Sequence, residues 1–263
     1  MTILNFSGTY DMQPFFDDVT CIRMDLRHLQ GVSRMCDISG QEELRHTLEP
    51  YGPSGIHFID SGNYHYISKL FIDKINFPFG LVVVDRHPDM QPPFWSEMLS
   101  CGGWVKEVMD HHPWLKQTLI IGAQDELIGQ LPEEDRKRAR FIATDQWEAV
   151  LEEVLVPPEI APSGTVLSQS ASQDVPRLLP IYLSIDKDVL TSEDAVTDWG
   201  NGNMTCSELT RIIQFIALRR SLIGVDICGD TADVRQHYPA SRAVQVNDRT
   251  NRHLYTVLSA YLN

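Results

Sequence analysis

The chain of 263 residues is long enough for one large α/β domain and too short for two of ordinary size. Its net charge of -14 opposes binding to nucleic acid or to an anionic membrane, and no stretch reaches the roughly 18 apolar residues of a membrane-spanning helix. The start lacks the pattern of a secretion signal, and the five scattered cysteines form no C-x-x-C pair. We therefore expect a single cytoplasmic domain over residues 1–263 with reduced cysteines.

Short apolar runs alternate along the chain with longer segments whose pattern suits helices. The expected strands lie at 3–7, 55–60, 80–85, 118–122, 140–144, 181–186 and 222–228. The expected helices lie at 64–74, 102–111, 145–155, 205–220 and 248–262. The strand segments are continuously apolar, which is typical of a sheet covered on both faces. Alternating strands and helices therefore predict a three-layer α/β/α sandwich with a mostly parallel sheet.

Two of the predicted helices begin with residues suited to capping. Asp145 is the expected N-cap of the helix at 145–155, and Thr205 with Glu208 has the spacing of a capping box. The loop 157–180 is rich in Pro, Ser and Gln. Because strands are predicted on both sides of it, we expect this loop to decorate one continuous domain.

Acidic and histidine side chains follow two of the apolar strands where each strand ends. Asp85, His87 and Asp89 are spaced by two, so in extended backbone they project to the same side. Asp186 and Asp188 repeat the pattern after a second strand. Each motif alone also suits a surface turn. Because ligands bind outside the carboxyl ends of parallel strands, however, we expect both clusters to face one crevice.

The chemistry of these side chains favours a divalent cation. Burying five such groups without a cation would cost on the order of several kcal/mol for each unpaired charge. Carboxylates with imidazole suit Mn²⁺ or a similar ion, whereas Zn²⁺ sites lean towards Cys and His. His65, which follows a third predicted strand, is a candidate sixth ligand, and Gly62 would allow the tight turn before it.

This pattern resembles the metal motifs of the arginase, agmatinase and formiminoglutamase family. The Asp-x-His-x-Asp at 85–89, the Ser-x-Asp-x-Asp at 184–188 and the Gly-x-x-His at 62–65 have the family's order and approximate spacing. The third is looser, because the usual Gly-Gly-Asp-His-Ser is replaced by Gly-Asn-Tyr-His-Tyr. The resemblance extends over about residues 52–230 and implies an arginase-like fold.

The resemblance also implies two Mn²⁺ ions per chain. The first ion would be held by His65, Asp85, Asp89 and Asp186. The second ion would be held by Asp85, His87, Asp186 and Asp188. In such a site, water bridging the two ions loses a proton near neutral pH and attacks the central carbon of a guanidino or amidine group. The implied activity is hydrolysis of a non-peptide C–N bond in a small guanidino or amidine substrate, with Asp89 able to relay a proton and with a possible homo-oligomer as the working form.

Three positions depart from the family pattern. The Glu that pairs with the guanidinium aligns with Gly229, and the adjacent Asp230 is a candidate replacement. The proton-shuttle His aligns with Cys101 or Gly102, and Cys101 is either a substitute acid or a small buried residue. The family's carboxylate-gripping Asn and Ser have no clear counterparts. These changes leave the metal ligands intact and call arginine into question as the substrate.

Several other residues near the motifs have more than one interpretation. The aromatic, Pro-rich loop at 90–95 suggests a more apolar pocket. Trp199 and Asn201 either shape the pocket floor or belong to a Gly-rich turn. His111 and His112, beside a proline, are expected to cap a helix rather than to bind metal.

Other classes of protein share parts of this pattern. Metallophosphoesterases also use Asp-x-His, but their Gly-Asn-His element is broken here and comes too early in the chain. Deacetylases of a similar fold hold a single Zn²⁺, and six candidate ligands argue against one ion. The remaining alternative is a catalytically inactive metal-binding scaffold or regulatory protein, which turnover of guanidino and amidine compounds would distinguish from an enzyme.

Overall fold

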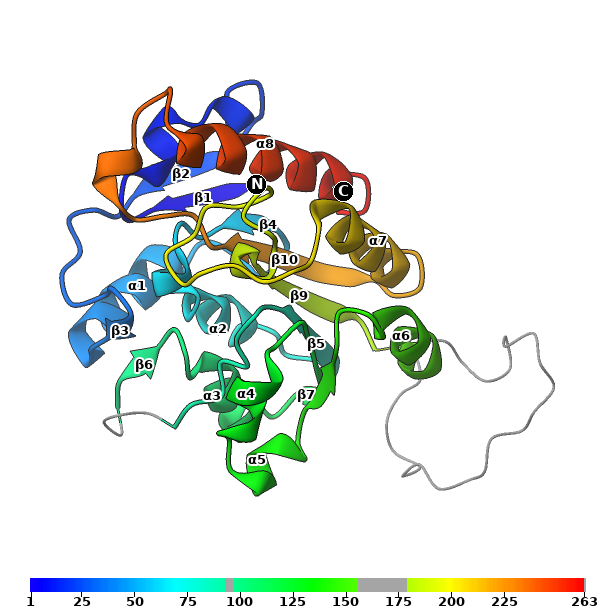
Figure 1. Ribbon diagram of the computed structural model, residues 1–263. Helices are drawn as coiled ribbons and strands as arrows, with labels where there is room; N and C mark the ends of the chain where they lie inside the picture. The colour runs from blue at the N-terminus through cyan, green and yellow to red at the C-terminus, as the bar shows by residue number, and fades with distance from the viewer. Residues whose placement is uncertain (93–96, 156–178, 263) are drawn as a thin grey trace, which may run out of the picture.

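The computed structural model describes residues 1–92, 97–155 and 179–262, and a parallel eight-stranded sheet forms its centre (Figure 1). Across the sheet the strands have the order β2-β1-β4-β10-β9-β5-β7-β8, and every neighbouring pair is parallel. Their bounds are β1 Thr2–Asn5, β2 Ile22–Asp25, β4 Gly55–Phe58, β5 Phe79–Val84, β7 Leu115–Ile121, β8 Arg140–Ile142, β9 Ile181–Asp186 and β10 Leu222–Cys228. All seven predicted strands are present. The short edge strand β2 was missed because two of the four residues in its IRMD sequence are charged and three are exposed.

Helices and a small second sheet complete the described part of the chain. The α-helices are α1 Ile38–Leu48, α2 Ile67–Ile72, α3 Trp104–His111, α4 Asp125–Gly129, α5 Glu133–Arg136, α6 Trp147–Leu155, α7 Cys206–Ala217 and α8 Arg242–Ser259. The 3-10 turns are η1 Thr9–Met12, η2 Pro14–Phe16, η3 Gly62–Tyr64, η4 Lys187–Val189 and η5 Val234–Gln236. The strands β3 (Met35–Cys36) and β6 (Leu99–Ser100) pair antiparallel.

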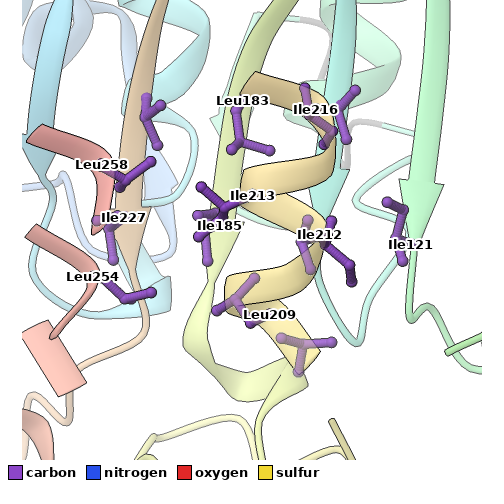
Figure 2. Packing of buried hydrophobic residues seen from close by; sticks show 14 of the residues in the cluster. Ile121, Leu183, Ile185, Leu209, Ile212, Ile213, Ile216, Ile227, Leu254 and Leu258 are labelled. Atoms are coloured by element: carbon purple, nitrogen blue, oxygen red, sulfur yellow. The ribbon is translucent and has the colours of Figure 1, made fainter. Parts of the chain in front are cut away.

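The sheet is covered on both faces, which confirms the three-layer α/β/α prediction. Alternate residues of β5 belong to different cores: Val82 and Val84 pack with α6, α7 and α8, whereas Leu81 and Val83 pack with α1, α2 and α3. Figure 2 shows the first core, where the apolar stripe of α7 lies over the side chains of β9. Because central strands such as β5 and β9 contribute to both cores, their sequences are largely apolar.

Capping residues set the helix boundaries differently from two of the predictions. The predicted N-cap at Asp145 is wrong, because α6 begins at Trp147 and the preceding turn is closed between Gln146 and Ala143. The capping box of Thr205 and Glu208 on α7 is confirmed. The last helix begins six residues before the predicted start at 248.

Ser241 accounts for that earlier start of α8. Its side-chain oxygen accepts a hydrogen bond from the backbone N–H of Val244, which is the usual N-cap arrangement. Most of the loop predicted at 157–180 lies outside the described residues. Within the described residues, no helix combines the length and the apolar character needed to span a bilayer.

The order of the central strands determines which side chains can meet. The strands β4, β10, β9 and β5 are consecutive across the sheet, and all four run in the same direction. Their carboxyl ends therefore lie side by side at one edge of the sheet. The predicted metal motifs follow β4, β5 and β9, so the sheet order brings segments more than 100 residues apart to one place.

Candidate metal centre

The turn after β5 carries the first three candidate ligands. Asp85 is the first residue beyond the strand and is buried. Its Oδ1 accepts a 2.6 Å hydrogen bond from the backbone N–H of His87, which folds the chain back over the carboxylate. Asp89 has a left-handed backbone with φ of 48°, a conformation that non-glycine residues adopt mainly where the surroundings enforce it. The indole N–H of Trp104 donates to Asp89 Oδ2 at 2.8 Å and holds that carboxylate in place.

The end of β9 supplies two further carboxylates. Asp186 is the last residue of the strand, and its Oδ1 accepts a hydrogen bond from the backbone N–H of Asp188 at 2.9 Å. This short 3-10 turn places both carboxylates at the sheet edge. Lys187, between them, is fully buried and pairs with Asp230 instead.

His65 reaches the same place from β4 through the turn η3. A Cβ added at Gly62 would lie 2.7 Å from Asp186 Oδ2, so only glycine permits this close approach. Gly229, with φ of 94°, is equally restricted, because a Cβ there would lie 2.4 Å from Asp186 Oδ1. The position that aligns with the family's guanidinium-binding Glu therefore has no room for a side chain.

The candidate ligands form two groups that share Asp85. In the first group, His65 Nδ1 lies 2.9 Å from Asp89 Oδ2 and 3.2 Å from Asp85 Oδ2, with Asp186 Oδ2 at 3.7 Å. In the second group, His87 Nδ1 lies 2.8 Å from an oxygen of Asp188 and 3.4 Å from Asp85 Oδ1. Each oxygen of Asp85 thus faces a different group, as a carboxylate that bridges two ions would.

The chemistry of these groups fits divalent cations. Two of their buried atoms, His65 Nδ1 and Asp188 Oδ2, lie within 3 Å of another candidate ligand atom but make no hydrogen bond of normal geometry among the described residues. Burial and the charge of Asp85 raise the pKa of Asp89 to about 6, and burial with the neighbouring carboxylates raises the pKa of Asp188 well above its usual range. Cations among the carboxylates would offset both effects.

A hydrogen-bonded chain behind His65 fixes its orientation. His65 Nε2 donates to Ser184 Oγ at 2.8 Å, and that hydroxyl donates to Asp226 Oδ1 at 2.5 Å. Nδ1 is therefore left to face the carboxylates, where a bound cation would take the place of a proton on this nitrogen. Partners of this kind orient ligand histidines in metal sites. The polar residue Asp226, in the otherwise apolar run of β10, was the sequence signal for this chain.

The two ligand groups open into a cavity of about 560 Å³. The described lining combines the ligands with apolar and polar side chains. It comprises Arg34, Met35, Gly62, Asp85, His87, Pro88, Asp89, Gln91, Pro92, Ser100, Cys101, Gly102, Leu127, Gln130, Leu131, Pro132, Asp186, Asp188 and Trp199. Of the loop predicted at 90–95, residues 93–95 lie outside the described residues.

Trp199 lines this cavity, as one of its two interpretations predicted. Its indole N–H donates to Asn63 Oδ1 at 3.0 Å, and its ring lies 6.1 Å from that of His87, centroid to centroid. The pocket-floor prediction is wrong for Asn201, which is not part of the described lining. The amide of Asn201 donates to the backbone carbonyls of Leu190 and Ala195 and so closes its own loop.

Arg34 is the only arginine or lysine among the described lining residues, and sequence reasoning missed it. Its backbone is left-handed, with φ of 66°. Its guanidinium lies over the ring of Trp199 at 5.2 Å, and its Nε donates to Asn63 Oδ1 at 3.3 Å. The cavity therefore has an acidic region at the ligands and a cationic group beside Trp199.

The remaining predicted catalytic residues lie in different surroundings. Cys101 lines the cavity, but burial and Asp89 raise the pKa of its thiol to about 12. A thiol with this pKa keeps its proton at neutral pH, and the two interpretations of Cys101, a substitute acid or a small buried residue, stay predictions. Asp230 does not face the cavity as a guanidinium-binding residue would: it is fully buried outside the described lining. Its carboxylate accepts hydrogen bonds from Lys187 at 2.7 Å and from the amide of Gln13 at 2.8 Å.

The two histidines at the end of α3 are not near the ligands. His111 is the last residue of that helix, and His112 Nε2 lies 3.0 Å from the backbone carbonyl of Ile72. Neither belongs to the described cavity lining. Their place at the end of α3, where His111 Nδ1 also lies 3.0 Å from the backbone carbonyl of Glu107, agrees with the prediction that they cap this helix.

Solved structures of ureohydrolases share this fold. The chain superposes on the agmatine ureohydrolase of Thermoplasma volcanium with a TM-score of 0.62 and 12% sequence identity, over 98% of this chain and 89% of that one. An arginase from Bacillus subtilis is similar with a TM-score of 0.60 and 13% identity, over 100% of this chain and 98% of that one. The chain therefore has the arginase-like fold that the motifs implied.

Comparison at the level of sequence finds a more similar relative. An uncharacterized protein of Thermotoga maritima is 26% identical over 231 residues, which cover 87% of this chain and 78% of that protein. No protein-family model matches the chain. The fold is thus shown by structure, and the activity has to be argued from the site.

Proposed function

We propose that this chain is a hydrolase of the arginase-like type, which uses two divalent metal ions to cleave a C–N bond in a guanidino or amidine compound. The observation that carries the proposal is the pair of ligand groups sharing Asp85 at the base of a cavity. A scaffold that needed metal only for stability would have no use for an open cavity of about 560 Å³ beside its ligands.

The residues divide into two metal positions. The first position would be held by His65, Asp85, Asp89 and Asp186. The second position would be held by Asp85, His87, Asp186 and Asp188. We propose Mn²⁺ as the expected ion, because carboxylate oxygens dominate both positions. Ions bound here would supply a polarised water at neutral pH.

The protein's own residues would position the substrate and move a proton. The indole N–H of Trp104 holds Asp89 Oδ2 in place. From this position Asp89 would relay a proton to the departing amine. Trp199 would pack against the substrate near His87. Neither Asp230 nor position 229 is available to bind a guanidinium, so the substrate's polar groups would meet the ligands and the cavity wall. The homo-oligomer and the cytoplasmic location stay predictions of the sequence.

The direct test is metal content and turnover of the purified protein. We expect about two divalent ions per chain after loading with Mn²⁺, and hydrolysis of at least one compound among agmatine, guanidinobutyrate, guanidine, arginine and formiminoglutamate. Release of urea, ammonia or amine would be measured with and without a chelator. Two bound ions with no turnover of any compound would favour the inactive metal-binding scaffold instead.

Arg34 predicts a preference among those compounds. A carboxylate at the far end of the substrate would accept charge-assisted hydrogen bonds from this guanidinium, which are worth about 1.5–3 kcal/mol. The substitution Arg34→Gln is expected to lower kcat/KM for guanidinobutyrate or formiminoglutamate by about tenfold or more. Agmatine, whose far end is cationic, serves as the matched control and should not lose activity. Equal losses on acidic and cationic compounds would contradict this role for Arg34.

A further inference from the structure

Cys228 lies within reach of the first metal position. It is the last residue of β10, the strand between β4, which leads to His65, and β9, which ends at Asp186. Cys228 and Asp186 are paired in register, and the thiol donates to Asp186 Oδ2 at 3.2 Å. His65, Asp186 and Cys228 each offer a ligand atom, and these three atoms lie within 4.8 Å of one another.

The surroundings of this thiol differ from those of an ordinary buried cysteine. Most buried cysteines pack as small apolar side chains. Cys228 instead faces the carboxylate of Asp186 and the imidazole of His65, whose buried Nδ1 makes no hydrogen bond of normal geometry among the described residues. A cation bound between these groups would favour the thiolate form of Cys228.

The other cysteine near the cavity provides a contrast. Cys101 lines the cavity, and burial together with the charge of Asp89 raises the pKa of its thiol. Within the described residues, however, Cys101 belongs to none of the groups whose ligand atoms could surround one ion, whereas Cys228 does. Of the two thiols, only Cys228 is placed to coordinate.

We propose that Cys228 Sγ is a ligand of the ion in the first position, beside His65 and the carboxylates of that group. This inference rests on the metal centre of the proposed function. It makes the two positions chemically unequal, because the first gains a soft sulfur donor and the second has only oxygen and nitrogen donors. The first position should therefore bind Zn²⁺, Co²⁺ or Fe²⁺ with a larger advantage over Mn²⁺ than the second position does.

Cobalt loading of the full-length protein tests the assignment. A thiolate bound to Co²⁺ gives a charge-transfer band in the near ultraviolet, which oxygen and nitrogen donors do not give. We expect this band in the wild-type protein and its loss in Cys228→Ser, with cobalt content measured in parallel. The matched control, Cys101→Ser, should retain the band. In competition experiments, the preference of the first position for Zn²⁺ over Mn²⁺ should fall by about tenfold or more in Cys228→Ser.

The outcomes separate this inference from the proposed function. Two bound cobalt ions without the band would leave the metal centre intact and overturn the role of Cys228. A band that persists in Cys228→Ser, or disappears in Cys101→Ser, would overturn it as well. Failure to bind any ion would count against the metal centre itself. If Cys228→Ser does not fold, X-ray absorption of the zinc-loaded wild type decides, because a sulfur ligand at about 2.3 Å is required.

Discussion

Replacing Asp85 with alanine is expected to empty both metal positions at once. Each oxygen of this carboxylate faces a different ligand group: Oδ2 lies near His65, and Oδ1 lies near His87. Metal content should fall from about two ions to fewer than one. The rate of hydrolysis should fall by a factor on the order of 1,000 or more, because the several kcal/mol that the ions contribute to the reaction are lost.

Asp60 offers a matched control for that experiment. It is a fully buried carboxylate at the same edge of the sheet, but it accepts hydrogen bonds from Ser7 and from the backbone of Phe6 and Ser61. Asp60→Asn should therefore retain both ions. Metal analysis of the two variants after identical loading provides the measurement. If Asp85→Ala still binds two ions, the shared carboxylate and the paired site are both wrong.

Replacing Lys187 with methionine is expected to destabilise the protein by about 3–5 kcal/mol. The ammonium group is fully buried, and it donates to Asp230 and to Asn251 Oδ1, each at 2.7 Å. Without it, the carboxylate of Asp230 stays buried with hydrogen bonds from neutral amides only. The free energy of unfolding, measured in urea on chelator-treated protein, would report the loss without a contribution from bound metal.

The double variant Lys187→Met with Asp230→Asn separates the charge from the packing. Removing both charges leaves no unpaired ion, and replacing both partners of a buried pair is often close to neutral. We expect the double variant to recover at least half of the lost stability. If the single variant is as stable as the wild-type protein, the ion pair contributes nothing measurable and Lys187 has another role.

The sequence was sufficient to predict the sheet and the metal motifs because both depend on local patterns. Strands buried on both faces have to be apolar throughout, so runs such as 80–85 and 181–186 stand out. The spacing of Asp85, His87 and Asp89 then puts charged groups at a strand end. Such patterns need no knowledge of which strands become neighbours.

The site residues that the sequence analysis missed or misassigned depend on contacts between segments far apart in the chain. Arg34 reaches the cavity through a left-handed backbone conformation and contact with Trp199, and no periodicity predicts either. The identification of Asp230 as a site residue assumed that its side chain faces the substrate, whereas the buried ammonium of Lys187 draws it away. Cys228 becomes a candidate ligand only because β10 lies between β4 and β9.

The placement of β10 and β9 between β4 and β5 also bears on how the chain folds. β4 and β5 follow one another in the sequence, but in the sheet they are separated by β9 and β10, which begin more than 90 residues after β5 ends. The centre of the sheet therefore cannot form until β9 and β10 have reached β4 and β5, and such pairing of distant segments slows folding. An ion held by side chains from β4, β5 and β9 would act as a reversible cross-link among these segments. At an ion concentration about 100 times the Kd, such binding stabilises the folded state by about 2.7 kcal/mol per ion.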